Sequence, residues 1–202
     1  MNPSIDDHAA RFDEKATEYD EDHSEEYRAA VSLVVEYADP GTDDVVLDVG
    51  TGTGAIALEL ADDARRVVGR DVSEGMLSQA REKATDRGTR NVSFDQGRFR
   101  APNLPEDESA DIVTSNFAMH HLSDSGKREA IETTAGLSPR RIVLGDVMFF
   151  GGPDPDEPFY SPDVDDPATV GVLADAFTDA GYALTAVELI QDQVGVLVAE
   201  RP

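Results

Sequence analysis

Three glycines at alternate positions, Gly50, Gly52 and Gly54, are suited to hold a ligand against the backbone. They follow the apolar, β-branched run 45–49, which indicates a strand buried on both faces, and the run 55–60 then has helical composition. A tight turn between such a strand and helix favours positive φ angles, and a side chain on it would keep a ligand off the backbone. Because the first amides of the helix point into this turn, the segment predicts a site for a nucleotide-like ligand with a negative group.

Two aspartates accompany the glycines. Asp48 lies inside the apolar run, where a buried carboxylate is costly unless it has a partner. Asp71 ends a second strand-like run, 66–71, near the ~20-residue offset that is typical of a carboxylate that binds a ribose. A carboxylate accepts two hydrogen bonds, and the vicinal hydroxyls of a ribose donate two. Asp71 therefore predicts a ribose contact, and a plain role at the entry of the next helix is the alternative.

The segment 48–54 closely resembles the first motif of class I S-adenosylmethionine-dependent methyltransferases, and the segment 72–77 resembles that family's continuation after the ribose-binding acid. The resemblance covers about residues 11–200, with the motifs in the right order. It implies that S-adenosylmethionine is the cofactor, with the glycine loop around its methionine part and Met76 near its adenine. The residues that we expect at the cofactor on this basis are Tyr19, Asp48, Gly50, Thr51, Gly52, Gly54, Asp71, Val72, Met76, Gly97, Arg98, Phe99 and Asn116.

Two arginines depart from the pattern of the family. Arg98 stands where that family usually has an acid that accepts a hydrogen bond from the adenine amine, and an arginine cannot accept one. We expect either a backbone carbonyl to replace this acid or Arg98 to stack on the base, with Phe99 as an apolar wall. Arg70, directly before Asp71, leaves open a cofactor that carries a phosphate on its ribose. In addition, the segment 138–141 replaces the usual Pro-Gly-Gly turn.

Candidates for proton transfer follow two later strands. The segment 116–122 resembles the fourth motif of the small-molecule branch of the family, which includes quinone-ring methyltransferases, and it contains His120 and His121. A histidine near neutral pH can take a proton from a substrate hydroxyl, although a histidine bonded to a backbone carbonyl fits the sequence equally well. Asp146, at the end of the run 142–147, either lines a substrate pocket or caps a turn. No metal site is expected, because no ligand stands at i+4 on the same helix face.

Two segments outside the strands are expected to cover the site. Phe12 and Tyr19 recur at helical spacing in the stretch 11–20, which predicts an amphipathic helix. Such a leader is similar to the one that closes over the cofactor in many small-molecule methyltransferases, so we interpret residues 1–37 as a helical cap. The stretch 151–167 is rich in Pro, Asp and Gly and predicts a loop. Its position after the fifth strand suits a substrate lid.

The composition bounds the partners of the chain. The 202 residues include 42 acidic and 17 basic side chains, and the resulting net charge of −25 repels nucleic acids and anionic membranes. The acidic residues are spread along the chain with few lysines, which looks like the proteome of a salt-accumulating halophile. There is no cysteine for a disulfide or a thiolate metal site. No secretory signal and no apolar run of ~20 residues is present, so we expect a cytoplasmic protein.

The alternation of strands and helices predicts an α/β fold, a Rossmann-like, doubly wound and mostly parallel sheet of seven strands with helices on both faces. The runs 182–190 and 193–200, joined by a short polar turn, predict an antiparallel hairpin at the C-terminal end of the sheet. We expect a single methyltransferase domain over residues 1–202, with its Rossmann-like core in residues 45–200.

Together, these features predict a methyltransferase that moves a methyl group to an oxygen, nitrogen or carbon atom of a small molecule. Two other functions stay open. A NAD(P)-dependent oxidoreductase could use the same kind of glycine turn. A regulatory protein could bind S-adenosylmethionine without turnover. The sequence identifies neither the methyl acceptor nor the general base, and it leaves a homodimer open.

Overall fold

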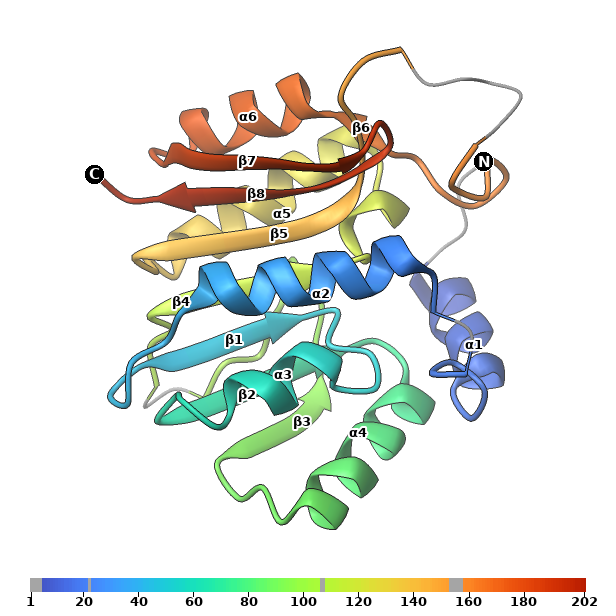
Figure 1. Ribbon diagram of the computed structural model, residues 1–202, viewed down its shortest axis with the longest axis vertical. Coiled ribbons are helices and arrows are strands. Elements are labelled where there is room, and N and C mark those ends of the chain that lie inside the picture. Colours follow the sequence, from blue (N-terminus) through green and yellow to red (C-terminus); the bar gives the residue numbers. More distant parts are fainter. Residues whose placement is uncertain (1–4, 22, 106–107, 153–157) are drawn as a thin grey trace.

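The structure is an open, twisted sheet with helices on both faces (Figure 1). This computed structural model describes residues 5–21, 23–105, 108–152 and 158–202. Within these residues the strands are β1 (Val45–Val49), β2 (Arg66–Asp71), β3 (Val92–Gln96), β4 (Ile112–Asn116), β5 (Arg141–Phe149), β6 (Ala168–Thr169), β7 (Ala183–Gln191) and β8 (Val194–Glu200).

The order of the strands is β3-β2-β1-β4-β5-β8-β7, and the short β6 pairs with β5. Strands β1 to β5 run parallel to one another, whereas β8 is antiparallel to both β5 and β7. The expected Rossmann-like sheet with an antiparallel hairpin at its C-terminal end is therefore confirmed. The two residues of β6, Ala168 and Thr169, add an eighth strand to the seven that were expected.

The helices cover the two faces of the sheet. They are α1 (Ile5–Lys15), α2 (Glu25–Ala38), α3 (Ala55–Leu60), α4 (Glu74–Arg87), α5 (Asp124–Gly136) and α6 (Val170–Asp179), with a 3₁₀ turn at Met119–His121. Helices α2, α3 and α4 share one buried core with Val46 of β1, and α5 and α6 share the opposite core with Leu47. Consecutive residues of β1 thus face opposite layers, as a strand buried on both sides requires.

Helix boundaries follow side-chain caps. Helix α5 starts at Asp124, because the hydroxyl of Ser123 accepts a hydrogen bond from the amide of Gly126. Helix α1 ends at Lys15, so Tyr19 lies in the turns beyond it and not on the helix predicted over residues 11–20.

Residues 153–157 of the expected lid, and residues 1–4 and 22 of the expected cap, lie outside the described part of the chain.

The fold places a crevice at the carboxyl ends of β1 and β4. Strand β1 pairs with β2 on one side and with β4 on the other, so the chain leaves these strands in opposite directions along the sheet. Helix α1 lies beside this edge and contacts α4 (Figure 1). Among the described residues, the helices all lack the length and apolar character that crossing a bilayer requires.

Candidate functional site

The glycine loop forms the floor of a cavity at this edge. Gly50, Gly52 and Gly54 have φ angles of +73°, +53° and +85°, in the left-handed region that favours glycine. A Cβ on Gly50 would lie 2.4 Å from the Cβ of Ala118, whereas a Cβ on Gly52 would meet no described atom within 4 Å. Gly50 is therefore needed for packing, while Gly52 leaves open space next to the backbone.

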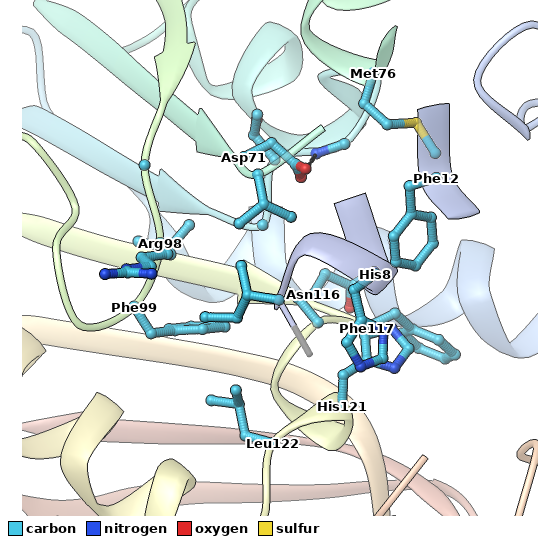
Figure 2. Close-up of a pocket in the computed structure, with 18 of the residues that line it drawn as sticks. His8, Phe12, Asp71, Met76, Arg98, Phe99, Asn116, Phe117, His121 and Leu122 are labelled. Carbon is cyan, nitrogen blue, oxygen red and sulfur yellow. Dashed lines mark hydrogen bonds between the residues drawn. The ribbon is translucent and has the colours of Figure 1, made fainter. Parts of the chain in front are cut away.

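Asp71 ties this loop to the next helix. Its carboxylate accepts hydrogen bonds of 2.9 Å each from the amides of Gly52 and Ser73, and burial raises its pKa. Figure 2 shows the carboxylate beside the cavity, which Asp71 lines. Each carboxylate oxygen has two lone pairs, so the group can accept a further hydrogen bond beyond those from the loop. Asp71 therefore shapes the loop as well as the cavity.

Two of the residues expected at the cofactor do not line this cavity. Asp48 is buried behind the loop, where it accepts a hydrogen bond of 2.7 Å from the hydroxyl of Thr114, and burial raises its pKa to about 6. Gly54 caps α3 and packs against Phe94. Both residues shape the loop from behind. The others do line the cavity, and they are Tyr19, Gly50, Thr51, Gly52, Asp71, Val72, Met76, Gly97, Arg98, Phe99 and Asn116.

The end of β4 adds an unpaired amide to the cavity wall. Asn116 is 8% exposed, and within the described residues neither its amide nitrogen nor its amide oxygen has a hydrogen-bond partner. Buried polar groups are normally hydrogen-bonded, so the amide of Asn116 points to a ligand that supplies the missing partners. The next residue, Phe117, has φ +51°, a strained value that is often found at functional sites.

The arginines behave differently from one another. Arg70 is buried, and its guanidinium donates to the backbone oxygens of Pro102 and Asn103 at 3.1 and 3.0 Å. It does not line the cavity, so the structure gives no support to a ribose phosphate at this position. Arg98 is exposed and lines the cavity, and its backbone pairs with Ala101. Figure 2 shows Arg98 and Phe99 together at one end of the cavity.

The N-terminal segment closes the opposite end. The carboxylate of Asp13 accepts hydrogen bonds from the hydroxyl of Ser73, at 2.6 Å, and from the amide of Gly75. Asp20 accepts one of 2.6 Å from the hydroxyl of Thr53. These contacts join the segment to α4 and to the glycine loop. They hold Tyr19 at the cavity, and burial raises the pKa of this tyrosine to about 12.

A cluster of histidines and carboxylates lies beside the cavity. The Nδ1 atom of His120 is 2.5 Å from one carboxylate oxygen of Asp146, and the other oxygen accepts hydrogen bonds from the amides of Met119 and His120. The Nδ1 atom of His121 is 2.8 Å from a carboxylate oxygen of Asp165. Asp146 lines neither of the two cavities around the site, so its observed role is to hold the 3₁₀ turn.

Burial sets the protonation of the pair His121 and Asp165. Burial lowers the pKa of His121 to about 4, more than the nearby carboxylates raise it. Burial alone would raise the pKa of Asp165, but the hydrogen bonds from His121 and from the amide of Ser161 lower it to about 2. At neutral pH the pair is therefore a neutral imidazole and a carboxylate.

A second cavity adjoins the first. Phe12, Tyr19, Phe117 and His121 line both cavities, while His120, Asp165 and His23 line the second one among others. All four histidines of the chain border one or both of these spaces, with His8 packed on His121 at a ring distance of 5.0 Å. Figure 2 shows His8, Phe117 and His121 grouped at one end of the first cavity.

Sequence reasoning missed several of these residues. Asp165 is 44 positions from His121, in a loop that no local motif connects to the 3₁₀ turn. His8, His23 and Tyr27 lie in the N-terminal segment, where only Phe12 and Tyr19 were singled out. The one available signal was the small number of histidines, because four in 202 residues make each of them worth placing.

Comparison with known proteins identifies the family. Residues 46–137 match the family described as "Methyltransferase domain". The chain is similar to an uncharacterized methyltransferase of Bacillus pumilus, with 32% identity over 149 residues, 72% of this chain and 67% of that protein. It is also similar to an uncharacterized methyltransferase of Geobacillus, with 34% identity over 146 residues, 68% of this chain and 66% of that protein.

A solved structure with a similar fold is the magnesium protoporphyrin IX methyltransferase ChlM of Synechocystis with bound SAM, at a TM-score of 0.67 and 19% identity. The match covers 100% of this chain and 86% of that one. Four of the curated relatives, 32% to 34% identical, are matched over 38% to 66% of their own length, so the chain spans less than two thirds of these proteins.

Proposed function

We propose, from the premise that this chain belongs to the S-adenosylmethionine-dependent methyltransferase family, that it transfers the methyl group of the cofactor to a small molecule. The unpaired amide of Asn116 beside the open glycine cradle carries this proposal. The two adjoining cavities fit the two ligands that such a reaction brings together. The shared wall between them, with Phe117 and His121, is where the reacting atoms would meet.

The residues of the first cavity fit the parts of S-adenosylmethionine, the cofactor of the family. Space beside Gly52 admits the methionine chain to the backbone. An amide side chain both donates and accepts, so Asn116 can pair with the carboxylate or the ammonium group of that chain. The carboxylate of Asp71, which lines the cavity, suits the ribose hydroxyls as a hydrogen-bond acceptor. Met76 and Phe99 offer apolar surface to the adenine.

The second cavity is the proposed place of the acceptor. Tyr19, Phe12 and Phe117 give it an aromatic wall, and His120, His121 and Asp165 give it polar groups. Such a mixture holds a small organic molecule by its flat faces and orients one polar group. Residues 158–167 of the expected lid would border the second cavity, because the amide of Asp166 donates to the backbone oxygen of His120 at 2.8 Å.

In the proposed reaction, the protein contributes mainly by positioning the cofactor and the acceptor. When bound, the cofactor brings a sulfonium that is already activated for methyl transfer, so alignment of donor and acceptor can provide much of the rate. The strained backbone of Phe117 fixes the wall between the two cavities. Tyr19, which stays protonated because burial raises its pKa to about 12, lines both sides of this wall without adding a charge. The His120 and His121 cluster is the group that would activate an acceptor nucleophile.

Calorimetric titration in molar KCl with S-adenosylmethionine, S-adenosylhomocysteine, NAD⁺ and NADP⁺ tests the cofactor, and a screen of metabolites for formation of S-adenosylhomocysteine tests the turnover. We expect saturable binding of the two adenosyl compounds, no heat from the nicotinamide nucleotides, and turnover with a subset of small aromatic or polyoxygenated molecules. Binding of NAD(P) alone would favour an oxidoreductase. Tight cofactor binding without turnover of any acceptor would favour a regulatory protein.

A further inference from the structure

Three potential metal ligands converge beside the second cavity. The liganding atoms of His120, His121 and Asp165 all lie within 4.8 Å of one another. The Nε2 atom of His120 is 3.9 Å from a carboxylate oxygen of Asp165, and the Nδ1 atom of His121 is 2.8 Å from the same oxygen. The three side chains are 7%, 14% and 7% exposed. They are therefore shielded on most sides and open toward the cavity that they line.

Asp146 orients the first of these ligands. A carboxylate can only accept hydrogen bonds, so the Nδ1 atom of His120 carries the hydrogen that points to Asp146. The lone pair of Nε2 is then presented toward Asp165. A histidine whose other nitrogen donates to a carboxylate is the usual arrangement behind metal-binding imidazoles, because it fixes both the tautomer and the ring.

The loop that carries Asp165 is fastened to the turn that carries the histidines. The ammonium group of Lys127, which is 2% exposed, donates to the backbone oxygens of Leu122 and Asp166. The amide of Asp166 donates to the backbone oxygen of His120 at 2.8 Å. These bonds join positions on both sides of the cluster, so its three ligands are held together before any ion arrives.

From this arrangement we propose that His120, His121 and Asp165 bind a divalent transition-metal ion through two imidazoles and one carboxylate. Imidazole ligands favour Zn²⁺, Fe²⁺, Co²⁺ or Ni²⁺ over Mg²⁺ and Ca²⁺, which prefer oxygen. Ligands at ~2.1 Å from one metal ion lie roughly 3–3.5 Å apart, so the widest pair must close by about 1 Å. The ion replaces the hydrogen on Nδ1 of His121, and this proton moves to Nε2 of the same ring.

The proposed ion would leave coordination positions toward the second cavity, because three protein ligands do not fill its shell. If the proposed function holds, the acceptor is then a molecule with one or two oxygen atoms that bind the metal, such as a hydroxyl next to a carbonyl or to a second hydroxyl. The metal would lower the pKa of the bound hydroxyl and present it as an oxyanion. Metal binding itself does not depend on this consequence.

The test uses the full chain without a polyhistidine tag, stripped of metal with a chelator and then titrated with Zn²⁺ and Co²⁺. We expect about one ion per chain after dialysis, measured by elemental analysis. We also expect visible absorption of Co²⁺ with the intensity of a site of four or five ligands. His121→Gln and Asp165→Asn should each weaken Zn²⁺ binding by at least tenfold. His23→Gln, in the same cavity but outside the cluster, and the exposed Asp163→Asn should bind Zn²⁺ as the wild type does.

Circular dichroism shows whether each variant is folded, and the Co²⁺ spectrum of the wild type is informative even if a variant is not. The proposal is overturned if the wild-type chain keeps well under one ion per chain, or if His23→Gln weakens binding as much as His121→Gln does. Titration with S-adenosylhomocysteine is run on the same samples. Failure of the metal site with intact cofactor binding therefore differs from failure of the proposed function.

Discussion

The two walls of the site are built in different ways. The wall around Gly50 and Gly52 comes from one short stretch of chain, and the amides of Gly50 and Thr51 are held by the backbone oxygen of Arg70 at 2.8 and 3.0 Å. The wall around His120 and His121 takes its partners from Asp165 and from the N-terminal segment. The first wall depends on backbone geometry, whereas the second depends on side chains from three distant segments.

The two walls differ in how many substitutions they can tolerate. A backbone cradle tolerates few changes at its glycines, because a Cβ either collides or enters the ligand space. A wall of side chains on a turn and a loop can exchange residues while the sheet stays intact. Under the proposed function, the wall around Gly50 and Gly52 would hold the cofactor, and the wall around His120 and His121 would set the specificity for the acceptor.

The largest predicted effect is a loss of cofactor affinity on substitution of Gly52 in the glycine loop. Gly52→Val should lower the affinity for S-adenosylhomocysteine by roughly 100-fold or more, because the new side chain occupies the open space and φ +53° strains a β-branched residue by about 1–3 kcal/mol. Calorimetry measures the affinity. Gly151→Val, at an exposed glycine with open space and without a left-handed φ, is the matched control and should bind normally. Normal binding of S-adenosylhomocysteine by Gly52→Val would contradict the proposed role of the glycine backbone.

The next effect concerns the carboxylate that joins β2 to the loop. Asp71→Ala should weaken cofactor binding by about 30-fold, since hydrogen bonds to a charged group contribute roughly 1.5–3 kcal/mol. The variant should also lose some stability, because the amides of Gly52 and Ser73 lose their acceptor. Asp95→Ala, which removes an exposed carboxylate from the neighbouring strand, should leave the affinity unchanged. Equal losses in the two variants would argue against a direct contact.

Asp48 gives a pH-dependent prediction. Burial raises the folded pKa of this carboxyl from its ordinary value of 3.8 to about 6, so the folded state favours the protonated form and the contribution of Asp48 to stability falls as the pH rises from about 4 to 6. Asp48→Asn should therefore gain about 1–2 kcal/mol in unfolding free energy relative to the wild type at pH 7. The gain should shrink toward pH 4. Denaturant titrations at several pH values measure this difference, and a gain that is independent of pH would contradict the raised pKa.

Salt should raise the melting temperature of the variants of either wall as it does that of the wild type. With a net charge of −25, repulsion between acidic side chains opposes folding in dilute buffer, and at 1 M salt the screening length is only ~3 Å. The melting temperature should therefore rise by several degrees between low salt and molar KCl, in the wild type and in the variants of either wall. An unchanged melting temperature would remove the support for adaptation to salt.

The smallest predicted effect tests whether the two walls are independent of each other. Asp165→Asn should change the affinity for S-adenosylhomocysteine by less than about threefold, because Asp165 lines the second cavity and not the first. Melting temperatures check that the variant is folded. A large loss of cofactor affinity would show that the two walls are not independent.

The same contrast explains how far the sequence could be read. Gly50, Gly52 and Asp71 were predictable because strand, turn and acid follow one another within one βαβ unit, and their spacing carries the geometry. The parallel order and the final hairpin followed from the alternation of strands and helices. Asp48 was singled out for its cost of burial, but its carboxylate turns to Thr114 behind the loop, and no spacing rule gives that direction.

The wall around His120 and His121 was less predictable for a physical reason. Asp165 and His8 reach the histidines only after the chain has folded, so no local pattern records their contact. Arg70 likewise looked available for a phosphate, but its donors are used by the backbone oxygens of Pro102 and Asn103. The sequence shows that an arginine is present there, whereas only the fold shows which acceptors are closer.

The most direct measurement is a crystal structure of the chain with S-adenosylhomocysteine. We expect its amino acid part to lie over Gly52 with a hydrogen bond to the amide of Asn116, its ribose hydroxyls to contact Asp71, and its sulfur to face the wall formed by Phe117 and His121. A ligand that binds away from Gly52 and leaves Asn116 unpaired would contradict the account.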